Sequence, residues 1–210
     1  MPAADRVVYI VDDDEAVRDS LVTLLEARAY RTKAFGTAEG FLESGAAPSL
    51  TGCLLLDVNL PGVGGLSLLQ QVKQICPHLP VLMITGMGQV ATAVQAMKAG
   101  ALDFLEKPLD PDALFALVDR AMAASARASA SAEQRSKART WLERLTPRER
   151  SVFDRLVQGK TNKQIAGELQ ISPRTVEIHR ANLMEKLGAT SVSDLIRLSS
   201  SVGAEPEAGN

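Results

Sequence analysis

The chain has 210 residues, of which 46% are hydrophobic and 23% charged, and its formal net charge at pH 7 is −2. This length allows one or two domains with adequate cores. The two cysteines, Cys53 and Cys76, exclude a disulfide framework, and we expect them to be inert core thiols in a reducing cytosol. No apolar run approaches the roughly 20 residues that cross a bilayer, and the N-terminus lacks a signal-peptide pattern, so we expect a soluble, cytoplasmic protein.

Charge is divided unevenly along the chain. Residues 1–121 carry 9 Lys and Arg against 15 Asp and Glu, whereas residues 141–202 carry 10 against 7. The segment between them, residues 122–140, carries 4 against 1. An acidic first part and a basic second part indicate different partners, and the basic part favours nucleic acid.

The first 120 residues alternate short apolar runs with amphipathic helical patterns. Strands are predicted near residues 7–11, 31–35, 51–56, 80–84 and 103–106, each followed by a helical segment. Five strands and five helices in strict alternation predict an α/β fold, a doubly wound five-stranded parallel sheet with right-handed crossovers.

Acidic side chains close two of these apolar runs. Asp57 ends one strand and precedes a loop rich in Pro and Gly, and Asp12, Asp13 and Asp14 follow another. Because the carboxyl ends of parallel strands meet at one edge of a sheet, these carboxylates are expected to lie close together. Like charges raise each other's pKa unless a cation compensates, and oxygen ligands suit Mg²⁺. The spacing therefore predicts a Mg²⁺ site with room for a phosphoryl group.

Two further polar side chains follow later strands. Thr85 ends the fourth apolar run, and its hydroxyl can donate to a phosphate oxygen. Lys107 follows the fifth run, and its ammonium group can pair with an anion. With this ordered set of carboxylates, hydroxyl and lysine, residues 5–122 resemble the receiver domain of two-component response regulators. The resemblance implies the flavodoxin-like strand order, which alternation alone does not fix.

The segment 123–143 is rich in Ala, Ser and Arg and contains neither Pro nor Gly. We expect the fifth helix to extend into a helical or polar linker here, with its order left open by composition. The segment has no apolar heptads, which argues against a dimeric coiled coil.

Helix signals dominate from Trp141 onward. Thr146, Pro147 and Glu149 form a capped helix start, and that helix is expected to stop at Gly159. A short helix is predicted over 162–169, a longer one from Ser172 to Leu187 ended by Gly188, and a last one over 191–198. A short helix, a tight turn and a longer helix are typical of a helix-turn-helix. We therefore predict a separate all-α domain of four helices.

The longer helix has two distinct faces. Val176, Leu183 and Leu187 fall on one side by the 3.6-residue period, whereas Ile178 and Ala181 point the opposite way. An outward face with few bulky residues can enter a major groove. Together with segments 145–149, 162–166 and 172–180, this pattern resembles the LuxR-type output domain. The whole chain resembles the FixJ branch of the NarL/FixJ response regulators.

The resemblance assigns roles in the receiver. Asp57 would be the phosphoacceptor, Lys107 would pair with the phosphoryl oxygens, and Thr85 and Phe104 would be the switch residues. Asp14 is expected to be a helix N-terminal acid without a metal role, and the bond between residues 107 and 108 is expected to be cis. The implied Mg²⁺ ligands are Asp12, Asp13, Asp57 and the backbone carbonyl of Asn59, with Asp12 acting mainly through water.

The resemblance also implies the function and the domain limits. By this resemblance, the chain would be a non-enzymatic response regulator and transcription factor. A sensor histidine kinase would phosphorylate it in the presence of Mg²⁺. The phosphorylated receiver would dimerise through residues 90–99 and 104–109, and the protein would bind promoter DNA, with RNA polymerase as a further partner and no membrane partner. The expected limits are 5–122 for the receiver, 123–143 for the linker, 144–202 for the helix-turn-helix domain and 203–210 for a tail.

The expected DNA contacts lie on the two helices of the helix-turn-helix. Glu177, Ile178 and Ala181 occupy the base-facing positions of the family, whereas the basic side chains would contact the DNA backbone. The full set is Lys160, Asn162, Lys163, Arg174, Thr175, Glu177, Ile178, Arg180, Ala181 and Asn182.

Two other functions stay open at this point. A Mg²⁺-dependent phosphohydrolase would typically need an acid/base carboxylate two residues after Asp57, where this chain has Asn59. Sustained turnover of a small phosphate ester would favour that reading. Alternatively, the helical part is an interaction module for a protein partner. Salt-sensitive DNA binding by residues 140–210 would separate this module from a DNA-binding domain.

Overall fold

The computed structural model describes residues 7–44, 50–86 and 90–202. The chain divides into two compact units, residues 1–129 and residues 130–210. The first two residues of the predicted receiver and the predicted tail lie outside the described residues, as does the segment 87–89 before the fourth helix.

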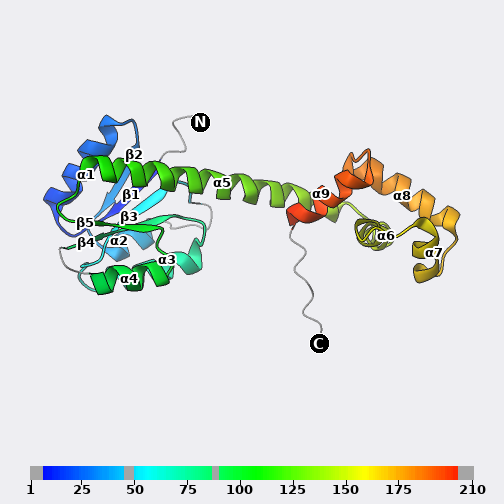
Figure 1. The fold of residues 1–210 in the computed structure, drawn as a ribbon, viewed down its shortest axis with the longest axis horizontal. Helices are drawn as coiled ribbons and strands as arrows, with labels where there is room; N and C mark the ends of the chain where they lie inside the picture. Colours follow the sequence, from blue (N-terminus) through cyan, green and yellow to red (C-terminus); the bar gives the residue numbers. More distant parts are fainter. Residues whose placement is uncertain (1–6, 45–49, 87–89, 203–210) are drawn as a thin grey trace. The chain divides into compact units, whose positions relative to one another are not determined.

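The first unit is built on a five-stranded parallel sheet in the order β2-β1-β3-β4-β5 (Figure 1). This order confirms the doubly wound, flavodoxin-like fold. Non-consecutive neighbours such as β1 and β3 bring the carboxyl ends of distant segments together. The strands are β1 (Val7–Val11), β2 (Arg31–Phe35), β3 (Cys53–Asp57), β4 (Val81–Thr85) and β5 (Asp103–Glu106).

Helices cover both faces of this sheet, and β3 and β4 are therefore buried along their whole length. One face packs against α1 (Glu15–Ala27) and the start of α5 (Pro111–Glu143). The other packs against α2 (Ala38–Glu43), α3 (Gly65–Ile75) and α4 (Val90–Lys98) (Figure 1).

Both cysteines lie in the core of the first unit, Cys53 on β3 and Cys76 just after α3. Burial raises the pKa of the Cys53 thiol to about 12, so the reactive thiolate is not formed at neutral pH. The prediction that both cysteines are core residues is confirmed.

The helix α5 is continuous over 33 residues. Within the first unit its buried Ser125 accepts a hydrogen bond of 2.9 Å from the backbone N–H of Gly52, which lies just before β3. Near the other end of the helix, Leu142 belongs to the core of the second unit. The segment whose order composition left open is thus helical as far as Glu143.

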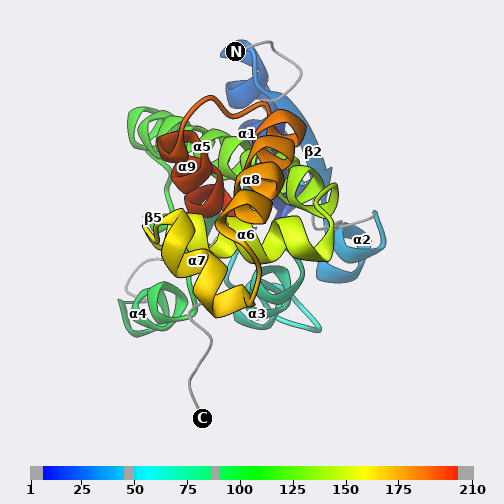
Figure 2. The same ribbon diagram turned by 90° about the vertical axis from the view of Figure 1, so that its right-hand side faces the viewer.

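The second unit contains α6 (Pro147–Val157), α7 (Asn162–Leu169), α8 (Pro173–Leu187) and α9 (Val192–Val202) (Figure 2). The capping box of Thr146 and Glu149 opens α6, and Gly188, with φ of 60°, ends α8. These ends and the tight turn between α7 and α8 confirm the predicted helix-turn-helix. Within the described ranges of both units, the structure contains no helix that meets the length and apolarity of a membrane span.

Candidate functional site

Three carboxylates meet at the carboxyl edge of the sheet. Asp57 is the last residue of β3, and Asp12 and Asp13 follow β1, its neighbour in the sheet. One oxygen from each carboxylate lies within 4.8 Å of the others. Asp12 and Asp57 are buried whereas Asp13 is exposed. The sheet therefore brings together the acids that the sequence predicted to share a site.

Lys107 supplies a positive charge to this cluster. Its Nζ donates to Oδ2 of Asp12 at 2.9 Å and to Oδ2 of Asp57 at 3.0 Å. The lysine follows β5, and its backbone N–H is held by the carbonyl of Thr85 at 2.8 Å. The peptide bond between Lys107 and Pro108 is cis, as the resemblance implied.

Burial and the neighbouring charges have opposite effects on the pKa values of Asp12 and Lys107. Burial raises the pKa of Asp12, and the hydrogen bonds from Lys107 and from the backbone of Asp14 offset this only in part. Burial by itself lowers the pKa of Lys107, but its hydrogen bonds to Asp12 and Asp57 outweigh that effect and raise the pKa overall. The lysine is therefore a fixed cation at neutral pH.

The donor set fits a hard divalent cation. All three side chains offer carboxylate oxygens, which suit Mg²⁺ better than softer transition metals. Asp13 is exposed, so a hydrated ion can reach the cluster, and Mg²⁺ typically keeps several of its waters. Asn59 adjoins the cluster, because its backbone N–H donates to Oδ1 of Asp57 at 3.2 Å.

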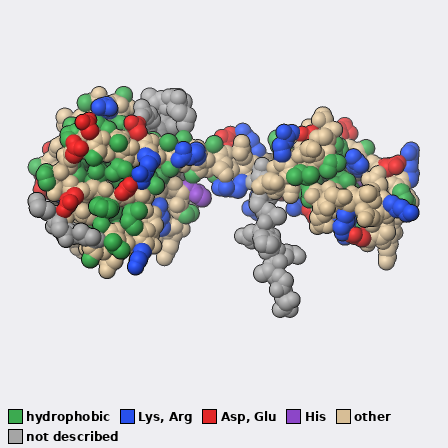
Figure 3. Space-filling view, viewed as in Figure 1, with side chains coloured by type: hydrophobic (Ala, Val, Ile, Leu, Met, Phe, Trp, Pro, Cys, Tyr) green, Lys and Arg blue, Asp and Glu red, His purple; other side chains and the backbone are tan. Residues whose placement is uncertain are grey.

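The two predicted switch residues lie on adjacent strands and do not contact Asp57 through a hydrogen bond in the described structure. Thr85 is buried at the end of β4, and its hydroxyl donates to the carbonyl of Leu105 on β5 at 3.4 Å. Phe104 is 43% exposed on β5. Its ring lines a surface hollow of about 440 Å³ together with Val94 and Met97 of α4. Figure 3 shows apolar side chains interspersed with charged ones on the side of the first unit that it presents.

Gly65 has a role that sequence reasoning missed. The sequence marked it only as a loop former, but it is the first residue of α3 and lies directly against β3. A Cβ on Gly65 would lie 2.1 Å from the carbonyl oxygen of Asp57 and 2.8 Å from Cα of Val58. Only glycine permits this approach of helix to strand.

Arg18 was also missed. It lies one turn into α1, and its Nη1 donates to the backbone carbonyl of Asp12 at 2.8 Å. Its position in the helix after the acidic turn is the only sequence signal for this contact. Asp14 lies at the helix N-terminus as predicted, because its side chain caps α1 by accepting from the backbone of Ala16 and Val17.

In the second unit, α8 has the two faces that the sequence predicted. Val176, Leu183 and Leu187 are buried, whereas Ile178 is 51% exposed and Ala181 is also exposed. Of the other predicted contact residues, Lys163, Arg174, Glu177 and Asn182 are exposed as well, and Arg174 forms an ion pair with Glu177 on the surface of α8.

The remaining predicted contact residues are engaged within the unit. Lys160 forms an ion pair with Glu168 of α7. The Thr175 hydroxyl is 2.8 Å from that of Ser172. A hydrogen bond of 3.5 Å from Arg180 to Oδ1 of Asn162 joins α8 to the start of α7. This bond joins the two helices that carry most of the predicted DNA contacts, α7 and α8.

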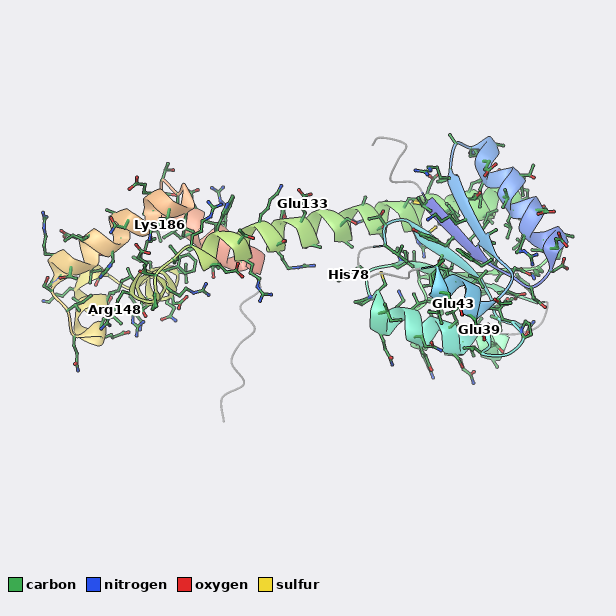
Figure 4. The ribbon with its side chains drawn as sticks, turned by 180° about the vertical axis from the view of Figure 1, so that it is seen from behind. Glu39, Glu43, His78, Glu133, Arg148 and Lys186 are labelled. Carbon is green, nitrogen blue, oxygen red and sulfur yellow. The ribbon has the colours of Figure 1, made fainter. Side chains whose placement is uncertain are left out.

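Glu149 links α6 to α8. The residue is 3% exposed, and its Oε2 accepts from the backbone of Thr146 at 2.8 Å and from Nζ of Lys186 at 2.7 Å. Lys186 comes from the last turn of α8 (Figure 4). Burial raises the pKa of Glu149, but the hydrogen bonds from Lys186 and Thr146 outweigh it and lower the pKa overall. The resulting stabilisation is complete above the unfolded pKa of about 4.3 and is lost as the pH falls through the lower folded pKa.

We expect Glu149→Ala to lower the free energy of unfolding of the second unit by about 2 to 3 kcal/mol, because it removes the charged hydrogen bond to Lys186 and one of the two bonds of the capping box. Glu149→Gln, which can still accept a hydrogen bond from the backbone of Thr146, should lose less of the free energy of unfolding. Denaturant unfolding followed by fluorescence of Trp141, the single tryptophan, measures both variants. The deficit of Glu149→Gln should shrink as the pH falls through the folded pKa of Glu149. An equal deficit at neutral and strongly acidic pH would contradict the role of the ion pair.

Comparison with known proteins assigns each of the two units to a family. Residues 8–119 match the family described as response regulator receiver domain, and residues 143–199 match bacterial regulatory proteins of the luxR family. The chain is 43% identical over 197 residues to the transcriptional regulatory protein FixJ of Bradyrhizobium diazoefficiens, with 93% of this chain and 95% of that protein covered. Its identity to FixJ of Rhizobium meliloti is 40% over 203 residues, covering 96% and 98% of the two chains.

Solved structures agree with this relationship. The response regulator StyR aligns with a TM-score of 0.82 and 37% identity, covering 94% of this chain and 99% of the StyR chain. Full-length FixJ from B. japonicum aligns with a TM-score of 0.56 and 42% identity, covering 94% and 97%. The chain therefore belongs to the response regulators that join a receiver domain to a LuxR-type DNA-binding domain, and it is a FixJ-like transcription regulator.

Proposed function

We propose that a sensor histidine kinase phosphorylates Asp57, and that this modification controls dimerisation and promoter binding. One observation carries the proposal: buried Asp57 lies 3.0 Å from the Lys107 ammonium and shares its surroundings with the carboxylates of Asp12 and Asp13. A carboxylate nucleophile next to a fixed cation and a cation-binding cluster is suited to accept a phosphoryl group.

The proposed transfer needs little chemistry from the protein beyond positioning. An oxygen of Asp57 forms a bond to phosphorus as the bond from phosphorus to the kinase histidine breaks, and the imidazole leaves. Lys107 then pairs with the phosphoryl oxygens. Mg²⁺, when bound, supplies further neutralisation of the transferred charge. Its proposed ligands are Asp12, largely through water, Asp13, Asp57 and the backbone carbonyl of Asn59.

The proposed switch involves Thr85 and Phe104. The Thr85 hydroxyl, which donates to Leu105 in the structure, would turn to the new phosphoryl oxygens, and Phe104 would move from its exposed position toward the space that the hydroxyl leaves. Phe104 has no hydroxyl, so it can be buried without a polar partner. This movement would change the surface formed by α4 and β5, and two such surfaces would then pair. The receiver, linker and output domain keep the limits 5–122, 123–143 and 144–202 in this proposal.

The phosphoacceptor role is tested by the mass of the intact chain after incubation with Mg²⁺ and a small phosphodonor. One added phosphoryl group in the wild-type chain and none in Asp57→Asn would support it. Continuous hydrolysis of a phosphate ester would instead favour a phosphohydrolase. Asn59 argues against that activity, because an amide cannot titrate as the acid and base of such a reaction.

The output unit is proposed to insert α8 into the major groove of promoter DNA, with RNA polymerase as a further partner. We expect Lys163→Ala and Arg174→Ala each to weaken binding to all duplexes alike and to reduce the salt slope of log K by about 1, because each removes a phosphate contact. Ile178→Ala should instead change the sequence preference. Fluorescence anisotropy of labelled duplexes at several salt concentrations measures these effects.

A matched control for this measurement is Arg197→Ala. Arg197 is an exposed residue on α9, where it is paired with Asp194, and its loss changes the charge by the same amount. Its salt slope should equal that of the wild-type chain. A reduction of the salt slope as large as that of Arg174→Ala would show that overall charge, rather than the face of α8, governs DNA binding.

A further inference from the structure

Asp12 is held at four polar atoms. Its backbone N–H donates to the carbonyl of Phe35, at the end of β2, at 3.2 Å. Its Oδ1 accepts from the backbone of Asp14 at 3.0 Å, and its Oδ2 accepts from Lys107 at 2.9 Å. The fourth atom, the backbone carbonyl oxygen, accepts from Nη1 of Arg18 at 2.8 Å.

The Arg18 guanidinium also packs against a second segment of the chain. An ideal Cβ on Gly36 would lie 3.4 Å from Nη1, 3.6 Å from Cζ and 3.8 Å from Nη2, so the guanidinium lies against the backbone of this glycine just after β2. The other end of the side chain belongs to α1, whose N-cap is Asp14. Arg18 thus ties the carbonyl of Asp12 to α1 and packs beside the end of β2.

The hydrogen bond from Arg18 affects the acidic site through the peptide unit that joins Asp12 to Asp13. The carbonyl of Asp12 and the N–H of Asp13 belong to the same rigid peptide unit, so fixing one fixes the other. A charge-assisted hydrogen bond from a guanidinium is among the stronger ways to hold such a carbonyl. The orientation of this plane sets where the backbone of Asp13 leaves the strand, and hence where its exposed carboxylate can reach.

We propose that Arg18 is a positioning residue, which acts through the Asp12–Asp13 peptide to hold the two carboxylates in the arrangement that binds Mg²⁺. The inference rests on the proposed function of the acidic cluster. The inference predicts a change in Mg²⁺ affinity opposite in sign to the change expected from electrostatic repulsion alone. As a cation near the cluster, Arg18 repels Mg²⁺, so a purely through-space role requires that its removal tighten binding. A positioning role requires that its removal weaken binding.

The test is calorimetric titration of the full chain with Mg²⁺, without phosphodonor. We expect Arg18→Met, which keeps an apolar stem without the donor, to raise the Kd for Mg²⁺ by about tenfold, in line with other residues that orient metal ligands. Arg18→Lys, which keeps one donor and the charge, should restore part of the affinity. At saturating Mg²⁺, phosphorylation of Asp57 in Arg18→Met should approach the wild-type extent.

Arg28→Met is the matched control. Arg28 directly follows α1 and lies over the ring of Phe115, with 4.2 Å from Cζ to the ring centroid, so its loss changes the same charge without touching Asp12. It should leave the Kd unchanged or slightly lower. Gly36→Val provides an independent variant that keeps Arg18 but crowds its guanidinium, and it should raise the Kd as Arg18→Met does.

An unchanged or lower Kd in folded Arg18→Met, with melting followed by circular dichroism, would overturn the inference. Equal weakening in Arg28→Met would overturn it as well. Failure of the proposed function has a different signature. In that case the wild-type chain itself would bind no Mg²⁺ or accept no phosphoryl group on Asp57, and both ideas would fall. Normal uptake by the wild-type chain with an unaltered Kd in Arg18→Met would refute the role of Arg18 alone.

Discussion

Incubation with Mg²⁺ and a small phosphodonor is expected to convert the wild-type chain from monomer to dimer, and Asp57→Asn is expected to abolish this conversion. The amide that replaces the carboxylate in this variant would keep the shape of the side chain but could not form the acyl phosphate. If the free chain populates the active arrangement at about 0.1–10%, phosphorylation should tighten dimerisation at least about tenfold. Light scattering or sedimentation measures the solution mass at several protein concentrations.

The α4–β5 surface can be tested separately from the chemistry. Met97 is 42% exposed beside Phe104, and Met97→Glu would place a charge in the proposed apolar contact. This variant should be phosphorylated like the wild-type chain but stay monomeric. Ile75→Glu is the matched control, because Ile75 is similarly exposed, at 40%, but lies on α3. It should dimerise normally.

Two outcomes would contradict this account of the switch. A wild-type chain that carries the phosphoryl group but keeps the mass of a monomer would exclude dimerisation as the response. Release of the output domain would then be the response to examine, for example by protease sensitivity of the linker. Dimerisation of phosphorylated Met97→Glu would instead move the contact away from α4 and β5.

Gly65→Ala is expected to damage both stability and phosphorylation. The new Cβ would lie 2.1 Å from the carbonyl of Asp57, and the atoms it meets belong to backbone that cannot rotate away. Moving α3 away from β3 should cost about 3 kcal/mol of the free energy of unfolding. A shift of Asp57 by about 1 Å should slow phosphorylation by about 100-fold, because transfer depends on positioning. Calorimetric unfolding and phosphorylation rates test the two effects.

Gly167→Ala serves as the control for this substitution. Gly167 lies inside α7, and a Cβ there would meet nothing within 4 Å. Alanine should therefore stabilise the second unit by about 0.5–1 kcal/mol, because it removes backbone freedom from the unfolded chain. Wild-type stability and phosphorylation in Gly65→Ala would show that α3 can shift without disturbing Asp57.

The main features of the fold were readable in the sequence because their causes are local. The alternation of strand and helix patterns predicted all five strands within about two residues. Thr146 with Glu149 and Ser172 with Pro173 predicted the starts of α6 and α8, since capping bonds span only three residues. The order of carboxylates, hydroxyl and lysine likewise indicated one shared edge of the sheet.

The continuity of α5 lay beyond this kind of reasoning. Ala and Arg favour helix, but the charge and serine content of residues 123–143 left an ordered helix and a frayed linker equally consistent with the composition. The buried Ser125, bonded to Gly52, holds the helix within the first unit, and Leu142 joins the core of the second. Contacts between residues far apart in sequence thus support the helix in each unit.

The geometry of the acidic site was also decided in three dimensions. Lys107 could be assigned a positive charge from its residue type, but its place between Asp12 and Asp57 depends on the packing of β5 beside β4 and of β3 beside β1. The direction of the Thr85 hydroxyl, the close approach of Gly65 and the hold of Arg18 on Asp12 follow from the same packing. Residue types and their spacing thus determined which groups take part, because those signals are local. Strand order and helix packing determined which atoms meet, because those distances join segments that are remote in the chain.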